Sequence, residues 1–197
     1  MIKIALTGSI GMGKSTVAAM FERAGIPLFD ADAEVRRLQG HEGPLLAPIE
    51  ARFPGVVRDG MLDREALAER VLAGPAALAD LEAIIHPSVM VARERFIAQH
   101  RDSPILLFDI PLLFETAGES AFDKVIVVSA PEAVERDRVL ARPGMTEGRL
   151  RSILERQMPD QEKRKRADWV VETGGDFSAT EAQVAAIIAC LGESDAR

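Results

Sequence analysis

The chain has 197 residues, a hydrophobic content of 47% and a formal net charge of -7. This size predicts one compact domain with room for inserted subdomains, and the acidity argues against a nucleic-acid partner. We find no apolar run of the length that spans a membrane, and no signal peptide at the start. The single cysteine, Cys190 in VAAIIACL, excludes an internal disulfide. We expect a buried thiol and a cytoplasmic location.

The first motif follows a short apolar segment at the start of the chain. Residues 2–6 predict a buried strand, and apolar residues from Val17 to Phe21 recur at helical spacing. Between them, residues 8–15 read GSIGMGKS and match the phosphate-loop pattern G-x-x-x-x-G-K-[ST]. Glycines let backbone N–H groups surround an anion, and the helix directs its positive end toward the same place. The alternative is a glycine-rich turn with an exposed lysine.

The phosphate-loop hypothesis gives each residue type a role. Lys14 is expected to reach the β- and γ-phosphates of ATP, and the Ser15 hydroxyl is expected to join the coordination of Mg²⁺. Met12 has no evident chemistry, and its alternative role is packing. The predicted ATP-binding residues are Gly8, Gly11, Met12, Gly13, Lys14, Ser15 and Thr16.

Further apolar segments predict the rest of a parallel sheet, with strands at 27–29, 105–108, 125–128 and 169–171. Helical patterns separate the strands, which is typical of an α/β fold with right-handed crossovers. About 75 residues lie between the second and third strands, and nearly all of them read as helix. A segment of this length predicts an insertion that stands off the sheet.

The insertion contains several proline residues that are expected to divide it into separate helices. These are Pro44, Pro48, Pro54, Pro75 and Pro87. Asp63 is a candidate N-cap for one of the helices, because apolar residues follow it at helical spacing.

The region from Glu132 to Arg166 is rich in basic residues. It holds eight arginines and two lysines against seven acids, a local charge of +3. A solvated helix face explains most of these side chains. An arginine-bearing helical hairpin is also suited to close over a nucleotide as a lid.

Two carboxylates follow the second strand in the segment LFDADAEVRR. Ligands bind at the carboxyl ends of strands in an open parallel sheet, so Asp32 is expected to face the phosphates. A carboxylate there can orient a hydroxyl group and accept its proton. The alternative is a pair of helix caps, and we interpret Asp30 as structural.

The segment ILLFDIPLLFE also ends a strand with a carboxylate, Asp109, in the pattern of an Asp that helps to hold Mg²⁺. The apolar residues around Leu113 either line a pocket or pack, and Glu115 is either a supporting group or a surface residue. His86 lies in AIIHPSV. A lone histidine is more often packed than catalytic, and its spacing supports no metal site.

Taken together, the motifs resemble those of the dephospho-CoA kinase family. They occur in family order over most of the chain: LTGSIGMGKST, DAD at 30–32, IIHP at 84–87, DIPLLFE at 109–115 and ILERQM-(x)4-KRKRADWVVETGG. The phosphate loop alone is unspecific, whereas HP followed by DIPLLFE is specific. The chain departs from the family at Ser9 (usually glycine), at Glu135 (commonly glutamine) and at ETGG (usually an Asn-rich turn).

The resemblance implies transfer of the ATP γ-phosphate to the ribose 3′-hydroxyl of dephospho-CoA, the last step of coenzyme A synthesis. It implies a P-loop nucleotide kinase-like α/β fold, a parallel five-stranded sheet flanked by helices, with a core at 1–31, 104–131 and 167–197. The insertion at 32–103 would bind CoA, and 132–166 would form the lid. Residues with implied roles are the base Asp32, the phosphate-binding Lys14, the lid arginine Arg142 and the substrate-binding His86, Asp109 and Leu113.

We therefore expect ATP, dephospho-CoA and Mg²⁺ as ligands, no nucleic acid, no membrane, and a monomer or weak homo-oligomer. A nucleoside or nucleotide kinase is the alternative enzyme, and the insertion and DIPLLFE argue against it. A small GTPase switch is the alternative of another class. The guanine motif Asn/Thr-Lys-x-Asp does not follow the strand at 125–128, which argues against the switch.

Overall fold

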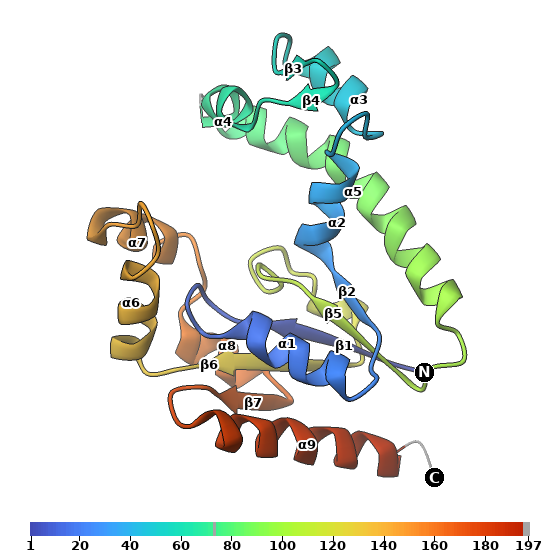
Figure 1. The fold of residues 1–197 in the computed structure, drawn as a ribbon, viewed down its shortest axis with the longest axis vertical. Helices are drawn as coiled ribbons and strands as arrows, with labels where there is room; N and C mark the ends of the chain where they lie inside the picture. Colours follow the sequence, from blue (N-terminus) through green and yellow to red (C-terminus); the bar gives the residue numbers. More distant parts are fainter. Residues whose placement is uncertain (73, 195–197) are drawn as a thin grey trace. The chain divides into compact units, whose positions relative to one another are not determined.

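The computed structural model describes residues 1–72 and 74–194, which form two compact units. One unit comprises Met1–Phe29 and the described residues from His100 onward (Figure 1). The other comprises Asp30–Gln99. The second unit is therefore inserted in sequence between the halves of the first.

The first unit is built on a five-stranded sheet with the strand order β2-β5-β1-β6-β7. The strands are β1 (Ile2–Thr7), β2 (Leu28–Asp30), β5 (Ile105–Asp109), β6 (Lys124–Ser129) and β7 (Trp169–Glu172). β1 pairs in parallel with β5 and β6, and β6 pairs in parallel with β7. All five predicted strands are confirmed to within one residue at either end. Parallel pairing places the carboxyl ends of these strands along one edge, where the loop after β1 begins.

Alternation along the central strands sends successive side chains to opposite faces of the sheet. On one face, Ile4 and Leu6 join a core with α1 (Lys14–Arg23) and α9 (Phe177–Ser194). On the other face, Ala5 packs with Leu113 and Phe114 of the segment after β5. The remaining helices of this unit are the 3₁₀ turn η1 (Glu119–Ala121), α6 (Glu132–Leu140), α7 (Glu147–Leu154) and α8 (Asp160–Arg166).

Cys190 does not take the buried position that its apolar neighbours predicted. The thiol-bearing residue is exposed. α9 buries a stripe formed by Val184, Ile187 and Leu191, and Cys190 lies outside this stripe. An apolar segment in the sequence therefore does not mean that every side of the helix is buried.

The second unit contains four helices and a small hairpin. Its elements are α2 (Ala31–Leu38), α3 (Leu46–Arg52), β3 (Val57–Arg58), β4 (Met61–Leu62), α4 (Arg64–Leu72) and α5 (Pro75–Gln99). Asp63 caps α4 as predicted, since its Oδ1 accepts the N–H of Ala66 at 3.0 Å. The hairpin was not predicted. Its turn has positive φ at Asp59 (50°) and Gly60 (70°), and the Asp-Gly pair is the sequence signal for such a turn.

The predictions that Pro48 and Pro87 divide helices are wrong, because Pro48 lies in the first turn of α3 and Pro87 lies inside the continuous helix α5. Proline removes one helical hydrogen bond and crowds the preceding turn, and Figure 1 shows α5 changing direction partway along its length. Leu81, Ile84 and Val89 of α5 pack against the core of this unit. That packing on both sides of Pro87 offsets the lost bond and keeps the helix in one piece.

α5 also corrects the expectation that no segment is long and apolar enough for a membrane. It has 25 residues and reaches a mean hydropathy of 1.2, so by length and composition alone it would suffice. The earlier expectation looked for an unbroken apolar run. In α5 the apolar residues are interrupted by single acidic ones, and part of them covers the core of the second unit.

Candidate active site

The loop between β1 and α1 is shaped by glycines that another residue could replace only with a clash or with a strained backbone. Gly11 and Gly13 have φ of 80° and 84°, a region that L-residues with a side chain rarely adopt. A Cβ on Gly11 would lie 2.6 Å from Cγ2 of Val139, and one on Gly8 would lie 2.6 Å from the carbonyl oxygen of Val128. The loop is therefore packed closely against β6 and α6 through bare backbone.

α1 begins directly at the end of this loop, with Gly13 as its N-cap and no capping side chain. The first amides of a helix have no acceptor within the helix, and the dipole makes this end positive. Ser15 and Thr16 in the first turn are exposed. These features suit the binding of an anion.

Lys14 forms an ion pair with Asp109, which ends the neighbouring strand β5. The strand register places Asp109 beside Leu6 of β1, which explains why residues so far apart in sequence meet. The pair is largely buried, with side-chain exposures of 16% for Lys14 and 7% for Asp109. The structure thus brings together two residues that the sequence analysis selected separately.

Ser15 and Asp109 are the candidate protein ligands of Mg²⁺. In the described part of the chain, no three His, Cys, Asp or Glu side chains converge as a metal site. Mg²⁺ in nucleotide enzymes is commonly held by few protein groups together with phosphates and water. One hydroxyl and one carboxylate beside a phosphate loop fit that pattern.

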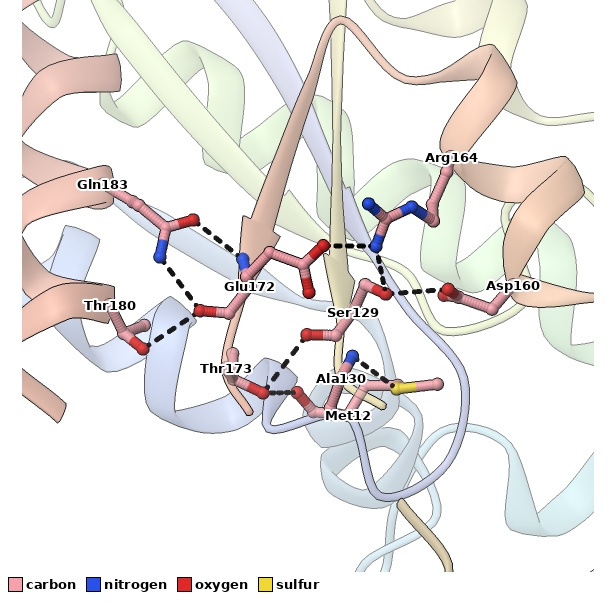
Figure 2. Close-up of polar contacts among 9 residues, drawn as sticks. All are labelled: Met12, Ser129, Ala130, Asp160, Arg164, Glu172, Thr173, Thr180 and Gln183. Atoms are coloured by element: carbon pink, nitrogen blue, oxygen red, sulfur yellow. Dashed lines mark hydrogen bonds and ion pairs between the residues drawn. The ribbon is translucent and has the colours of Figure 1, made fainter. Parts of the chain in front are cut away.

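One flank of the loop is held by Thr173, the residue after β7, and by Arg138 of α6. The Thr173 hydroxyl donates to the carbonyl of Met12 at 2.6 Å (Figure 2). Arg138 donates to the Thr173 hydroxyl at 3.0 Å, to the Thr173 carbonyl at 2.6 Å and to the Gly11 carbonyl at 3.4 Å. Three distant segments are therefore fixed to one another here.

A pocket of about 420 Å³ opens on this flank. Its lining includes Gly11, Gly13 and Thr16 of the loop region, Arg138 and Arg142 from the end of α6, and Thr173 and Phe177 near α9. Phe177 is 54% exposed, so its ring is open to a ligand. Planar guanidinium and aromatic groups of this kind stack on flat rings such as a nucleotide base.

The other flank of the loop borders a second hollow, of about 460 Å³, lined by Ser9, Met12, Glu135, Gln157 and Asp160 among others. Gln157 accepts the N–H of Ile10 at 3.2 Å. Glu135 is only 6% exposed, and its Oε1 has no hydrogen-bond partner within the described residues. Burial raises the pKa of Glu135, and the nearby carboxylates Asp160 and Glu132 raise it further.

Glu115, by contrast, is a paired carboxylate that holds the hairpin of helices to the core. It lies 2.9 Å from Nζ of the fully buried Lys163, and it accepts the N–H of Met158 at 2.8 Å. Burial alone would raise the pKa of Glu115, but the bonds from Lys163 and Met158 lower it overall. The sequence left Glu115 as either a supporting group or a surface residue, and these contacts favour the supporting group.

The remaining candidates differ in their surroundings. Asp30 caps α2, accepting the N–H of Ala33 at 2.8 Å, as its structural interpretation predicted. Asp32 is exposed in the first turn of α2, and His86 is exposed on α5. Leu113 has no accessible surface and packs in the core. The exposed side chain next to it is Leu112.

The sequence analysis missed Arg138, Thr173 and Gln157. Arg138 lies four positions before Arg142, the spacing of neighbours on one helix face, so this pair carried a signal. Thr173 directly follows the last strand, at the edge where ligands bind. Gln157 had no signal beyond its place in ILERQM, because its acceptor role depends on a loop 147 residues away.

Three comparisons with known proteins agree with this architecture. The family model described as "Dephospho-CoA kinase" matches residues 2–178. A dephospho-CoA kinase from Mesorhizobium japonicum is 54% identical over 191 residues, which are 95% of each chain. A crystal structure from Thermus thermophilus is 38% identical, with a TM-score of 0.86 over 98% of this chain and 97% of that one. The dephospho-CoA kinase of Campylobacter jejuni shares the fold, with a TM-score of 0.69 at 22% identity over 98% of each chain.

Proposed function

This chain belongs to the dephospho-CoA kinase family, and from that premise we propose how its residues act. The enzyme transfers the γ-phosphoryl group of ATP to the ribose 3′-hydroxyl of dephospho-CoA, which gives coenzyme A and ADP. The observation that carries the proposal is the pairing of Lys14 with Asp109 at the carboxyl edge of the sheet, directly beside the glycine loop.

The loop and Lys14 bind the triphosphate. Backbone amides from Gly11 to Thr16 surround the β-phosphate, and Lys14 leaves Asp109 to contact the β- and γ-phosphates. Asp109 and Ser15 are then available to Mg²⁺, which when bound neutralises charge that develops on the phosphates. The ring of the base lies in the 420 Å³ pocket, against the exposed ring of Phe177.

Transfer proceeds by direct in-line displacement. The 3′-oxygen of dephospho-CoA forms a bond to the γ-phosphorus, and the bond to the β,γ-bridging oxygen breaks with its electron pair on ADP. The hydroxyl proton passes to the carboxylate of Asp32. Arg142 stabilises the negative charge of the transition state, and positioning supplies most of the rate enhancement.

The parts of the chain take the roles that the family resemblance implies. Residues 32–103 bind CoA. His86 of this segment and Asp109 at the end of β5 contact the acceptor. Residues 132–166 close as a lid. Because Leu113 is buried, we propose that it acts by packing beneath the acceptor-binding segment. We further propose a cytoplasmic monomer or weak homo-oligomer that acts without nucleic acid or membrane, in keeping with the net charge of -7.

The proposal is tested by incubating the purified protein with ATP and, separately, dephospho-CoA, adenosine, AMP and shikimate. We expect ADP release only with dephospho-CoA, and a product heavier by one phosphoryl group in the mass spectrum. Faster turnover of a nucleoside or nucleotide would contradict the assignment of the acceptor.

A further inference from the structure

We infer that Thr173 is a positioning residue, whose hydroxyl sets the conformation of the phosphate loop from the wall of the base pocket. The inference rests on the proposed function, since it assumes that the loop binds the phosphates of ATP. The turn after β7 then has a second role besides lining the base pocket. Through Thr173, the same turn fixes the backbone that binds the phosphates.

Thr173 is well placed for this role because its own position is independently secured. Its N–H donates to the carbonyl of Ser129 at 2.9 Å, which extends the pairing of β6 and β7 by one residue. The residue is 7% exposed. Its hydroxyl lies 2.6 Å from the Met12 carbonyl and 3.4 Å from the Ser129 carbonyl. A hydroxyl has a single proton to donate, and the shorter contact identifies Met12 as its acceptor.

The carbonyl of Met12 shares a peptide group with the N–H of Gly13. All peptide bonds of the described residues are trans, and in a planar trans peptide the C=O and N–H point in opposite directions. The Thr173 bond to Met12 therefore aims the Gly13 N–H away from Thr173, toward the other side of the loop. Amides aimed in this way are the donors that bind phosphate in a glycine loop.

The Met12–Gly13 peptide needs such a support. Both neighbours of Met12, Gly11 and Gly13, are glycines with positive φ. Glycine allows many backbone conformations, so the sequence alone does not hold this peptide in one orientation. The side chain of Met12 is held separately, because its sulfur accepts the N–H of Ala130 at 3.0 Å (Figure 2). Thr173 and Ala130 together fix Met12 from its main chain and its side chain.

Arg138 completes the arrangement from α6. It donates to the acceptor lone pair of the Thr173 hydroxyl and so orients the hydroxyl proton toward Met12. It also donates to the Gly11 carbonyl at 3.4 Å. Arg138 and Thr173 thus hold two consecutive carbonyls of the loop on one side.

The test compares Thr173→Val, Thr173→Ser and Ser129→Ala. Valine keeps the shape of threonine but has a methyl group in place of the hydroxyl, so it removes the bonds with Met12 and Arg138, whereas serine keeps the hydroxyl. Ser129→Ala is the matched control: it removes a buried hydroxyl that binds Asp160 at 2.7 Å and Arg164 at 2.9 Å, and that makes no bond to the loop. The Ser129 carbonyl, which Thr173 uses, is unchanged.

We measure binding of ATP and of inorganic tripolyphosphate by calorimetry, together with kcat, the KM for each substrate and thermal unfolding. We expect Thr173→Val to weaken both ATP and tripolyphosphate about 10-fold, the factor that corresponds to one hydrogen bond. The KM for dephospho-CoA should stay unchanged. Thr173→Ser should restore binding to within about threefold, and Ser129→Ala should lower only the stability.

Two results would overturn the inference. In one, Thr173→Val lowers stability as Ser129→Ala does and leaves tripolyphosphate binding unchanged, so its role is structural. In the other, it weakens ATP but not tripolyphosphate, so it acts on the base alone. Because binding is measured without an acceptor, these results stay separate from a failure of the proposed function, which would appear as a wild-type enzyme that does not phosphorylate dephospho-CoA.

Discussion

The candidate residues for ATP and those for the acceptor lie in surroundings of different kinds. In the first unit, Lys14 is paired with Asp109, and the loop backbone is bonded to Thr173, Arg138 and Gln157. In the second unit, Asp32 and His86 are exposed side chains on helices. The first set is fixed by bonds that exist before any ligand binds, and the second set is only presented to solvent.

The residues for ATP and those for the acceptor therefore reach their working geometry in different ways. Preorganised groups lose little freedom when they bind, so the loop backbone needs few adjustments once the Lys14–Asp109 ion pair has opened. Exposed residues such as Asp32 gain a defined geometry only from the substrate that they contact. Substitutions should therefore act on binding and turnover together in the first unit, and mainly on turnover at Asp32.

Lys14→Ala tests the fixed half most severely, and we expect it to abolish detectable transfer. Lys14 is the lysine of the phosphate-loop motif, so its removal deprives the phosphates of their main cation. Because the structure shows that Lys14 also pairs with Asp109, thermal unfolding must be measured beside activity. Unchanged turnover in a folded variant would remove the phosphate-loop assignment.

Arg142→Lys should cost the next largest amount, on the order of 10³-fold in kcat, because an arginine that serves the transition state is hard to replace. An ammonium lacks the planar two-pronged donor geometry of a guanidinium. Steady-state kinetics with saturating ATP measure this loss.

Arg151→Ala is the control for the arginine-rich region, since Arg151 is exposed on α7, and it should lose little activity. Arg149→Ala is also expected to lose little, but it is a less clean comparison, because Arg149 donates to the Gly144 carbonyl at 3.0 Å in the turn after Arg142. Equal and small losses for all three arginines would mean that this charge serves only solvation.

Asp32→Asn tests the exposed half and should lower kcat by about 10²-fold, the scale of lost general-base help. The affinity for ATP should barely change, because the proposed role of Asp32 is toward the acceptor hydroxyl. Calorimetry with ATP and kinetics with dephospho-CoA separate the two effects. A collapse of ATP binding would identify Asp32 as a fold or metal residue instead.

Glu135→Gln sharpens the comparison within the first unit and should have the smallest effect. A carboxyl whose pKa is raised in the folded state favours folding at low pH. Its unfolded form titrates near the ordinary value of 4.5. As pH rises above that value, the unfolded chain loses the proton first, and wild-type stability falls until the folded carboxyl also ionises. Glutamine removes this loss.

We expect Glu135→Gln to raise the Tm at pH 8 by about 2–4 °C, the shift that follows from roughly 1 kcal/mol in a chain of this size, with the advantage disappearing near pH 4. Glu22→Gln, which changes an exposed carboxylate on α1 that does not act on Glu135, should leave the Tm profile close to that of the wild type. If the difference in Tm between the two variants is the same at every pH in this range, the Glu135 carboxyl has a compensating partner.

The strands, the loop and the Asp63 cap were predictable because each depends on residues near one another in sequence. A short apolar segment marks β1, and the glycine spacing marks the loop. The bond from Thr173 to Met12 joins positions 161 residues apart, and no local pattern encodes it. Pro87 was misjudged for the same reason, because packing on both sides of it, not local propensity, keeps α5 continuous. The burial of Leu113 also depends on its distant neighbours in β1 and β6.

The ion pair between Lys14 and Asp109 has a consequence for which anions the enzyme admits. Because Lys14 is already paired with the carboxylate of Asp109, an incoming anion has to replace that carboxylate. Orthophosphate brings negative charge for Lys14 but brings no cation to take the place of Lys14 beside Asp109. Nucleotide that arrives with its metal satisfies both residues at once. With the assignments proposed above, we expect the pair to favour metal-bound nucleotide over abundant simple anions.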